Sequence, residues 1–238
     1  MPEPRPGAAP RGVLVTRPEP DAAETAARLA TLGWRPVLAP ALVLSSRHFR
    51  PLRAQALLLT SRAAARALSP WDIPVLAVGE ATAEAARERG FTQVFAADGD
   101  AVAMVAFCAE RLDPKAGPLL LAIGEGYSIE LAAALRAQGF RVVRRVVYAA
   151  EESIEFPNEA LDALRNHEVS HALFFSPRSA RCSVRHLTAC GLSEALRGVE
   201  AIAISPRVAA VLEGLPWRSV RTATRPDQDH ILELLGPT

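Results

Sequence analysis

Residues 13–34 read VLVTRPEPDAAETAARLATLGW and contain the pattern that decides the fold. The run VLVT is apolar without alternation, which is typical of a strand buried on both faces of a sheet. Pro18 and Pro20 end this strand, and Asp21 opens a D-x-x-E capping box before apolar residues at helical spacing. Gly33 follows as the C-cap, so the stretch predicts a buried strand and then an amphipathic helix.

The same alternation continues along the chain. A second strand is predicted at residues 34–44, and short apolar strands then alternate with helices up to the C-terminal segment DQDHILELLG. Strands that alternate with helices in this way predict parallel sheets with helices on both faces. We therefore predict the α/β fold class.

A repeat within the chain is the second clear pattern. Residues 13–34 align with residues 119–140, which read LLLAIGEGYSIELAAALRAQGF, and Gly33 then falls on Gly139. Three further pairs of segments align in order: 57–65 with 173–181, 76–91 with 202–217, and 94–107 with 220–233. A repeat of about 110 residues indicates duplication of a domain, not a solenoid of short repeats.

Two extended connectors rich in Val and Pro, 40–46 and 144–153, lie at related positions of this repeat. If the chain crosses between domains at both, its first strand and helix complete the C-terminal domain. The predicted domains are 1–40 with 153–238, in which residues 1–12 form a disordered tail, and 46–144, with linker strands at 41–45 and 145–152. We expect the two halves to face each other across a hinged cleft that binds the ligand at the strand ends.

The composition excludes several classes of protein. Lys and Arg number 27 and Asp and Glu number 26, so bulk charge does not favour a nucleic-acid binder. No apolar run approaches the roughly 18 residues of a membrane span, and the start MPEPRPGAAPRG lacks the apolar core of a signal peptide. The three cysteines and five histidines are scattered, so we expect neither a disulfide nor a metal site. These features predict a cytoplasmic protein and, without an evident exposed apolar stripe, a monomer.

Several nucleotide and nucleophile motifs are incomplete. Gly124-Glu125-Gly126 follows a predicted strand, but Ile129 stands where a dinucleotide fingerprint needs its third glycine. The stretch from Gly126 resembles a nucleophile elbow only until Glu130, and the chain has no G-K-[ST] phosphate loop. If the protein is an enzyme, we expect it to act without a cofactor, a metal or a covalent nucleophile.

Polar turns recur where predicted strands end and helices begin. Small hydroxyl residues cap a helix start, the free N–H groups there attract anions, and arginine forks suit carboxylates. Capping alone explains any one of these turns, but their joint occurrence favours an anion-lined cleft. The candidate binding residues are Arg17, Thr60, Ser61, Arg62, Gly79, Thr82, Gly124, Glu125, Ser176, Arg178, Ser179, Ser205 and Arg207. Arg47, Arg144 and Arg145 near the connectors either add to this set or are solvated surface charges.

An ordered set of segments carries a resemblance to a known family. These segments are VLVTRPEPDAAETAARLATLGWRPVLAPAL, LLLTSRAA, AVGEATAEAARERGF, VVYAA, FFSPRSA and AIS with its following helix. From about Gly12 to Leu235 the chain resembles the uroporphyrinogen-III synthases. The resemblance implies two flavodoxin-like domains joined by a two-stranded linker. It also implies a cofactor-independent lyase of heme biosynthesis, which cyclises hydroxymethylbilane to uroporphyrinogen III with loss of water and inversion of ring D, through a spirocyclic intermediate.

The implied substrate fits the candidate residues. Hydroxymethylbilane is a linear tetrapyrrole rich in carboxylates, which arginine forks and backbone N–H groups bind. Its spontaneous closure gives the wrong isomer, so catalysis in this family is largely positioning. The tyrosine proposed in the family as proton donor to the leaving hydroxyl corresponds to Tyr148, and a phenol of pKa about 10 is protonated at neutral pH. The alternative is a tyrosine that only packs the linker.

Two positions depart from the family pattern. The chain reads Pro206-Arg207-Val208 where the family often has a Thr, and Ser128 replaces an Arg common after the strand LLLAIG. These departures support an alternative, a non-catalytic two-domain tetrapyrrole-binding or sensor protein, and Tyr148 counts against it. A nucleotide-dependent flavodoxin-like regulator is a more distant alternative, because the phosphate loop is absent.

Overall fold

The computed structural model describes residues 12–125 and 129–236. The chain divides into two compact units. Unit 1 holds the residues up to Val43 and those from Glu151 onward, and unit 2 is Leu44–Ala150. The chain therefore passes from one unit to the other twice.

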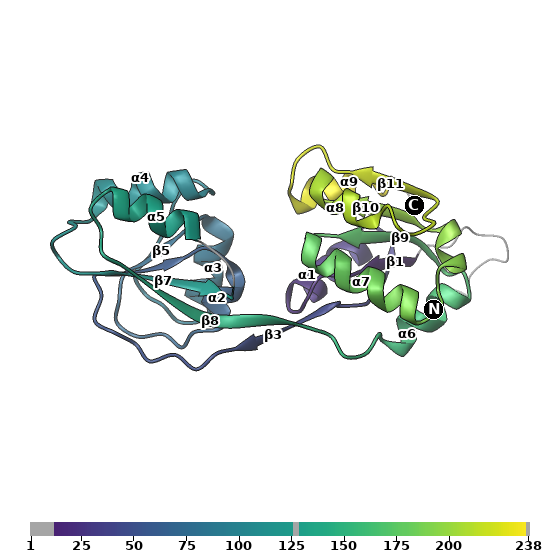
Figure 1. Ribbon diagram of the computed structural model, residues 1–238, viewed down its shortest axis with the longest axis horizontal. Coiled ribbons are helices and arrows are strands. Elements are labelled where there is room, and N and C mark those ends of the chain that lie inside the picture. The colour runs from purple at the N-terminus through teal and green to yellow at the C-terminus, as the bar shows by residue number, and fades with distance from the viewer. Residues whose placement is uncertain (1–11, 126–128, 237–238) are drawn as a thin grey trace. The chain divides into compact units, whose positions relative to one another are not determined.

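Unit 1 is built on a parallel sheet (Figure 1). The strand order is β11-β10-β9-β1-β2, and every neighbouring pair is parallel. The strands are β1 Gly12–Val15, β2 Arg35–Leu38, β9 Val169–Phe174, β10 Glu200–Ala203 and β11 Ser219–Thr222. The helices are α1 Asp21–Thr31, α6 Asn158–Arg165, α7 Pro177–Ala189, the 3-10 helix η1 Glu194–Gly198, α8 Pro206–Leu212 and α9 Gln228–Glu233.

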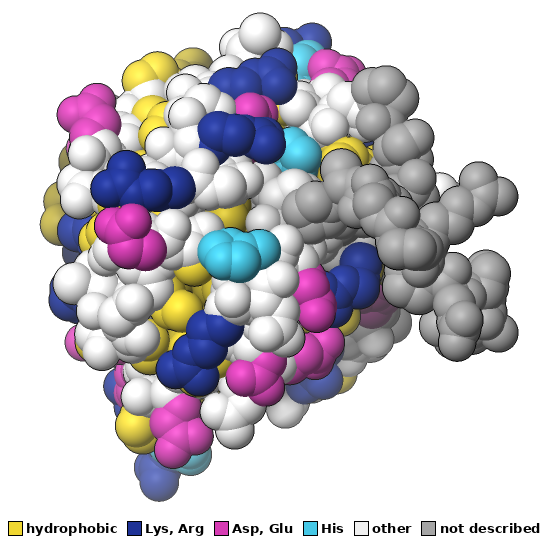
Figure 2. All heavy atoms as spheres, turned by 90° about the vertical axis from the view of Figure 1, so that its right-hand side faces the viewer, with side chains coloured by type: hydrophobic (Ala, Val, Ile, Leu, Met, Phe, Trp, Pro, Cys, Tyr) yellow, Lys and Arg dark blue, Asp and Glu magenta, His cyan; other side chains and the backbone are white. Residues whose placement is uncertain are grey.

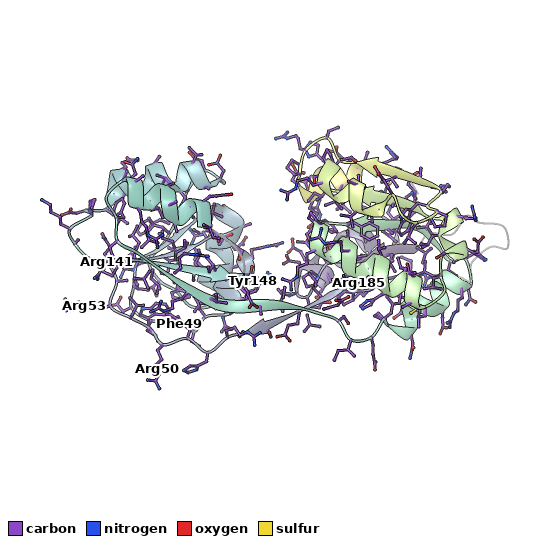
Figure 3. All side chains as sticks on the ribbon, viewed as in Figure 1. Phe49, Arg50, Arg53, Arg141, Tyr148 and Arg185 are labelled. Atoms are coloured by element: carbon purple, nitrogen blue, oxygen red, sulfur yellow. The ribbon has the colours of Figure 1, made fainter. Side chains whose placement is uncertain are left out.

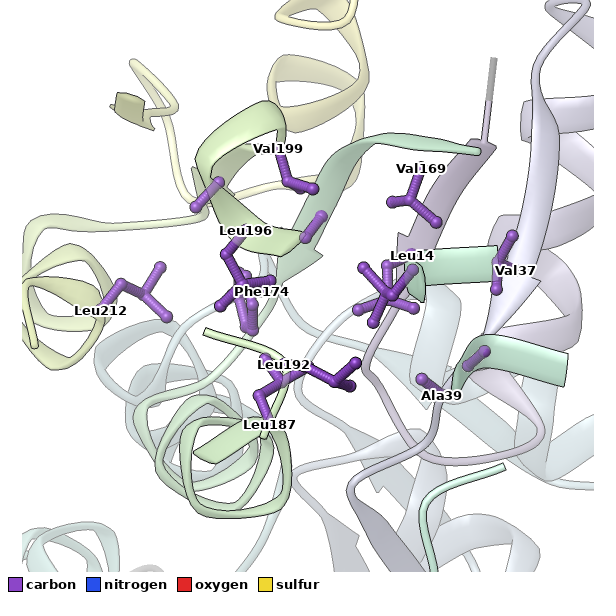
Figure 4. Packing of buried hydrophobic residues seen from close by; sticks show 14 of the residues in the cluster. Leu14, Val37, Ala39, Val169, Phe174, Leu187, Leu192, Leu196, Val199 and Leu212 are labelled. Atoms are coloured by element: carbon purple, nitrogen blue, oxygen red, sulfur yellow. The ribbon is translucent and has the colours of Figure 1, made fainter. Parts of the chain in front are cut away.

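Helices cover both faces of this sheet. On one face, α1 and α9 bury Leu29 and Ile231 against Val13 of β1. On the other face, α6, α7 and α8 pack around Leu14 and Phe174 (Figure 4). Burying one such side chain contributes about 1.5–3 kcal/mol, which explains why β1 is an unbroken apolar run.

Unit 2 repeats this plan. Its sheet has the order β3-β8-β7-β4-β5-β6, and the strands from β8 to β6 are parallel. The strands are β3 Leu42–Ser46, β4 Ala56–Leu59, β5 Val75–Ala77, β6 Val94–Ala96, β7 Leu119–Gly124 and β8 Val142–Glu152. The helices are α2 Arg62–Arg66, α3 Glu80–Glu88, α4 Ala101–Arg111 and α5 Ile129–Ala137. Met104 and Leu135 on α4 and α5 cover one face, and Ala64 and Ala86 on α2 and α3 cover the other.

The two sheets match strand for strand. Reading β11-β10-β9-β1-β2 against β6-β5-β4-β7-β8 places β1 on β7, β9 on β4, β10 on β5 and β11 on β6. These are the pairs of strands that the sequence repeat aligns. The α/β class with parallel sheets is confirmed, and the repeat corresponds to two sheets of the same order.

Strands β3 and β8 are neighbours at the edge of the sheet in unit 2. The Arg47 N–H donates to the Val147 carbonyl at 2.8 Å, and the Ser153 N–H donates to the Ala41 carbonyl at 3.0 Å. Residue numbers rise along one strand as they fall along the other, which is the pattern of an antiparallel pair.

The single strand predicted at residues 34–44 is wrong. It is two strands, because β2 pairs with β1 in unit 1 whereas β3 pairs with β8. Pro40 lies between them and has no N–H to continue a ladder.

The predicted tail also ends one residue too late. Gly12 begins β1, and its N–H donates to the Glu168 carbonyl at 3.0 Å. A β-carbon on Gly12 would lie 2.4 Å from that oxygen, so the close approach requires glycine. The rest of the tail, residues 1–11, lies outside the described residues, as do Gly126, Tyr127 and Ser128. Among the helices that are described, none is both long and apolar enough to cross a membrane.

Candidate functional site

The polar turns lie at the carboxyl edges of the two parallel sheets. Parallel strands all end at the same edge, so turns that follow neighbouring strands lie side by side. The predicted residues form one group in each unit. In unit 2 they are Thr60, Ser61, Arg62, Gly79, Thr82, Gly124, Glu125 and Tyr148, and in unit 1 they are Arg17, Ser176, Arg178, Ser179, Ser205 and Arg207.

Tyr148 lies in β8, beside the end of β7 (Figure 3). It is half-buried and packs against the cluster that holds Val147. The pairing register shifts here, because Ile123 pairs with Val146 whereas Gly124 pairs with Tyr148. This strand therefore carries an irregularity at the predicted catalytic residue.

The Tyr148 hydroxyl lies 3.4 Å from Oγ of Ser61. Ser61 is the N-cap of α2, and its Oγ accepts the Ala64 N–H at 3.1 Å. Thr60 precedes this cap and Arg62 begins the helix, and both side chains are partly exposed. The tyrosine hydroxyl and the start of α2 therefore share one corner of unit 2.

The other predicted residues of unit 2 differ in exposure. Gly79 is the N-cap of α3, where a β-carbon would lie 3.2 Å from Cα of Gly99. Thr82 is buried within α3, so its side chain packs in the protein interior. Glu125 is exposed, and its N–H donates to the Tyr148 carbonyl at 3.1 Å.

In unit 1, Ser176 caps α7 and forms a closed pair with Ser179. Oγ of Ser176 accepts the Ser179 N–H at 3.1 Å, and Oγ of Ser179 donates to the Ser176 carbonyl at 3.2 Å. Ser179 is 1 % exposed, so its hydroxyl stabilises the helix start. Arg178, between them in sequence, is partly exposed at this edge.

The start of α8 is less completely capped. Ser205 is its N-cap but makes no side-chain capping bond, and Pro206 follows it in the first turn. Arg207 is exposed in that turn. Val208, at the position that departs from the family pattern, is fully buried in the core of unit 1.

Arg17 is held by groups of the protein itself. Its guanidinium donates to Oδ2 of Asp21 and to Oε1 of Gln228, each at 2.7 Å, and lies 4.4 Å above the ring of Phe175. The side chain is only 13 % exposed. Arg17 lies at a strand end as predicted. Its guanidinium, however, contacts α1 through Asp21, α9 through Gln228 and the turn after β9 through Phe175. Gln228 and Phe175 were missed from the sequence, and no local signal links a residue 211 positions away to Arg17.

The arginines near the connectors have different settings. Arg47 and Arg145 are exposed, whereas Arg144 is partly buried. Nη1 of Arg145 donates to the Arg144 carbonyl at 3.0 Å. Two of the three therefore present charge to solvent.

The described residues offer little for metal or thiolate chemistry. Over the described parts of the chain, no group of three or more His, Cys, Asp or Glu side chains is placed to hold a metal ion. Burial raises the pKa of the Cys108 thiol to about 11, so it is not a thiolate at neutral pH. On the face drawn in Figure 2, Lys and Arg side chains are interspersed with Asp and Glu.

A groove of about 480 Å³ lies between α4 and α5. Its lining is apolar and includes Val102, Val105 and Leu131, with none of the predicted binding residues. An apolar groove does not suit a polyanionic substrate, so the strand-end turns remain the candidate site.

Together these features define a two-unit parallel α/β protein whose strand ends present helix starts, arginines and one tyrosine, suited to an anionic ligand. A family model described as HEM4, uroporphyrinogen-III synthase HemD, matches residues 23–233. The chain belongs to the uroporphyrinogen-III synthase family, which confirms the resemblance. Enzymes of this family are cyclising lyases of heme biosynthesis that act on hydroxymethylbilane, so the non-catalytic alternative is not favoured.

The fold of one solved structure agrees with that of this chain. The uroporphyrinogen-III synthetase of Helicobacter pylori is 17 % identical, with a TM-score of 0.61 over 94 % of this chain and 98 % of that one. A mutant uroporphyrinogen III synthase from the extremely thermophilic bacterium Thermus thermophilus is 19 % identical, with a TM-score of 0.46 over 96 % and 97 % of the two chains. No curated protein sequence matches this chain.

Proposed function

We propose that this chain cyclises hydroxymethylbilane to uroporphyrinogen III with Tyr148 as the proton donor. The observation that carries the proposal is the Tyr148 hydroxyl, 3.4 Å from the N-cap of α2 at the carboxyl edge of unit 2. A phenol is protonated at neutral pH and can donate to the hydroxyl that leaves the substrate. Departure of that hydroxyl as water leaves an electrophilic azafulvene, which the last pyrrole ring attacks with inversion.

The solvent-accessible residues of the strand-end turns bind the substrate in this proposal. Arg62, Arg178 and Arg207 each lie in the first turn of a helix that begins at the carboxyl edge of its own sheet, near the free backbone N–H groups of that turn. Carboxylates of the tetrapyrrole suit this combination. Arg17 holds the surrounding elements together rather than contacting substrate, since its donors already serve Asp21 and Gln228.

The remaining candidates support these turns. Glu125 and Ser205 supply acceptors for pyrrole N–H groups of the substrate, whereas the caps at Ser176 and Gly79 orient the N–H groups of α7 and α3. No cofactor or metal is needed, because the reaction is a dehydration and ring closure without redox change. Catalysis then consists of proton transfer to and from one side chain and of the positioning of a flexible substrate.

Each unit is proposed to be a flavodoxin-like domain. In chain order, the strands of unit 1 give the sheet order 2-1-3-4-5, which flavodoxin-like sheets share. The sheet of unit 2 gives the same order when β7 and β8 are counted first. The proposed domains are 1–40 with 153–238 and 46–144, joined by the strands 41–45 and 145–152 as a two-stranded linker. The enzyme is proposed to act in the cytoplasm as a monomer, and light scattering on the purified protein tests the oligomeric state.

The decisive assay supplies hydroxymethylbilane and measures the isomer of the product after oxidation to porphyrin. The type III isomer is expected, formed faster than spontaneous closure. Accumulation of the type I isomer alone, at the spontaneous rate, would refute the activity. Tyr148→Phe is expected to lower kcat by about 100-fold, the scale of a general-acid contribution, while the thermal midpoint stays within a few degrees of the parent.

A further inference from the structure

We propose that Gly124 and Ser61 are positioning residues that orient the Tyr148 hydroxyl. Gly124 on β7 gives the tyrosine ring the space to pack on the backbone, which we call the seat, and Ser61 contacts the hydroxyl at the start of α2. The inference rests on the proposed function, in which Tyr148 donates the proton. It assigns to these two strand-end residues a role different from binding the substrate.

The irregularity in β8 turns Tyr148 toward α2 and α3. In a regular strand, Val147 and Tyr148 would face opposite sides of the sheet. Here both pack against the same cluster, which lines the α2 and α3 face. The register shift after Val146 accounts for this, because a bulge places an extra residue on one strand and re-aims the side chain that follows.

Gly124 provides the space that this orientation needs. A β-carbon there would lie 2.5 Å from Cζ, 2.6 Å from Oη and 2.9 Å from Cε2 of Tyr148. Real β-carbons do not approach other atoms so closely, so any other residue at this position displaces the ring. The conformation of Gly124 itself is not the reason, since its φ is not in the left-handed region. The tyrosine ring lies directly on the glycine backbone.

Ser61 lies at the same end of the side chain, beside the Tyr148 hydroxyl. Its Oγ accepts the Ala64 N–H, so its own proton is available to the Tyr148 oxygen at 3.4 Å. A distance of this length is expected to shorten when substrate binds, as catalytic hydrogen bonds commonly do. After Tyr148 gives its proton to the departing hydroxyl, the phenolate accepts from Ser61. After the spirocyclic intermediate opens, the free α-carbon of ring D forms the last ring bond and loses its proton. That proton returns to the phenolate, so the tyrosine is restored.

A double-mutant cycle tests the seat. Gly124→Ala is expected to lower kcat by about 100-fold with little change in KM, the scale of a misplacement of about 1 Å. In a Tyr148→Phe background, where no hydroxyl remains to be aimed, the same change should lower kcat less than about threefold. Gly198→Ala is the control, because a β-carbon there meets open space. Wild-type turnover in Gly124→Ala, or an equal loss in both backgrounds, overturns the proposal.

A spectroscopic readout separates this inference from the proposed function. The chain has only two tyrosines, so 3-fluorotyrosine labelling gives two ¹⁹F signals, and Tyr127→Phe assigns the one from Tyr148. Gly124→Ala should shift or broaden that signal, and Gly198→Ala should leave it in place. If Tyr148→Phe keeps full turnover while Gly124→Ala still moves the Tyr148 signal, the proton-donor role is refuted but the seat is supported. If the signal does not move, the seat is refuted.

Replacements at Ser61 separate capping from positioning. Asp caps a helix about as well as Ser but only accepts hydrogen bonds, and Thr keeps the hydroxyl. Ser61→Asp is therefore expected to preserve the thermal midpoint and lower kcat at least about tenfold, whereas Ser61→Thr restores most of it. Full kcat in Ser61→Asp would show that Ser61 is a cap alone.

Discussion

Arg185 donates two hydrogen bonds to the carboxylate of Glu152, one from Nε at 3.1 Å and one from Nη2. Glu152 is the last residue of β8, and Arg185 lies on α7. Nε2 of His186 lies 3.9 Å from the same carboxylate, and its ring meets the ring of Phe156 edge-on. The bidentate pair thus fastens the end of β8 to α7 within unit 1.

We expect Arg185→Lys to loosen this end of β8, because lysine does not reproduce the planar fork. The measurement is amide exchange at Ser153, whose N–H donates to the Ala41 carbonyl, and it should become faster in the variant. Arg197→Lys is the matched control, since Arg197 pairs with Glu194 at an exposed site on η1. Equal exchange at Ser153 in both variants would contradict the role of the pair.

The pair of Arg185 and Glu152 should also make the rate of amide exchange at Ser153 depend on pH. The hydrogen bond from Arg185 is the main cause that lowers the pKa of Glu152 from its ordinary value. A lowered pKa means that the stabilisation is present at neutral pH and is lost as the pH falls through the folded value. Exchange, corrected for its intrinsic rate, should therefore accelerate below about pH 4 in the parent and less in Glu152→Gln.

Arg17→Lys is expected to destabilise unit 1 by about 1–3 kcal/mol, because lysine cannot serve Asp21, Gln228 and Phe175 together. Urea unfolding followed by tryptophan fluorescence measures the loss. Arg28→Lys is the control on the same helix, since its pair with Asp229 is exposed and is expected to cost under about 1 kcal/mol. A stable Arg17→Lys variant with a raised KM would instead return Arg17 to the substrate-binding set.

The sequence was sufficient for the alternation of strands and helices, because each element carries a local signal. The repeat then matched the strands of the two sheets, as β1 and β7 illustrate. The prediction for residues 34–44 failed because the two halves of this stretch pair with different strands. β2 pairs with β1, which precedes it by 23 positions, whereas β3 pairs with β8, about a hundred positions later. Local periodicity carries no information about that choice.

The candidate site was predicted to the level of its turns but not of its contacts. Ser61 and Ser176 cap helices through a local contact, because a hydroxyl at a helix start can accept a backbone N–H of the first turn without help from distant residues. The orientation of Tyr148 depends on a register shift between β7 and β8, which the pattern of either strand alone does not reveal. Gly124 was predicted as a binding residue and as the first glycine of an incomplete G-x-G-x-x-G, not as the residue on which the tyrosine ring packs.

Cys190 is expected to be the fast-reacting thiol of the native protein. Burial raises the pKa of both Cys108 and Cys182, so little thiolate forms there at pH 8, whereas Cys190 is partly exposed. Alkylation at pH 8 followed by peptide mass spectrometry should label Cys190 first and all three cysteines after denaturation. Rapid native labelling of Cys108 would contradict its burial in the core of unit 2.

His171 should make unit 1 less stable as the pH falls below 7. Burial is the main cause that lowers the pKa of its imidazole, with Arg218 and Arg221 adding to the effect and Glu200 opposing it. The ring also meets Trp34 edge-on, and Nδ1 lies 2.9 Å from Oγ of Ser170.

Because the folded pKa lies below the unfolded value of about 6.5, the unfolded chain binds more protons between the two, and acid favours unfolding. The free energy of unfolding should therefore drop more between pH 7.5 and 5.5 in the parent than in His171→Phe, which keeps the ring contact but cannot titrate. Trp71→Phe removes the tryptophan of unit 2, so fluorescence then reports Trp34 and Trp217 of unit 1. His167→Asn serves as control, because His167 is exposed and asparagine tolerates its φ of 56°. Equal pH dependence in His171→Phe and the parent would show that His171 titrates no differently in the folded and unfolded chain.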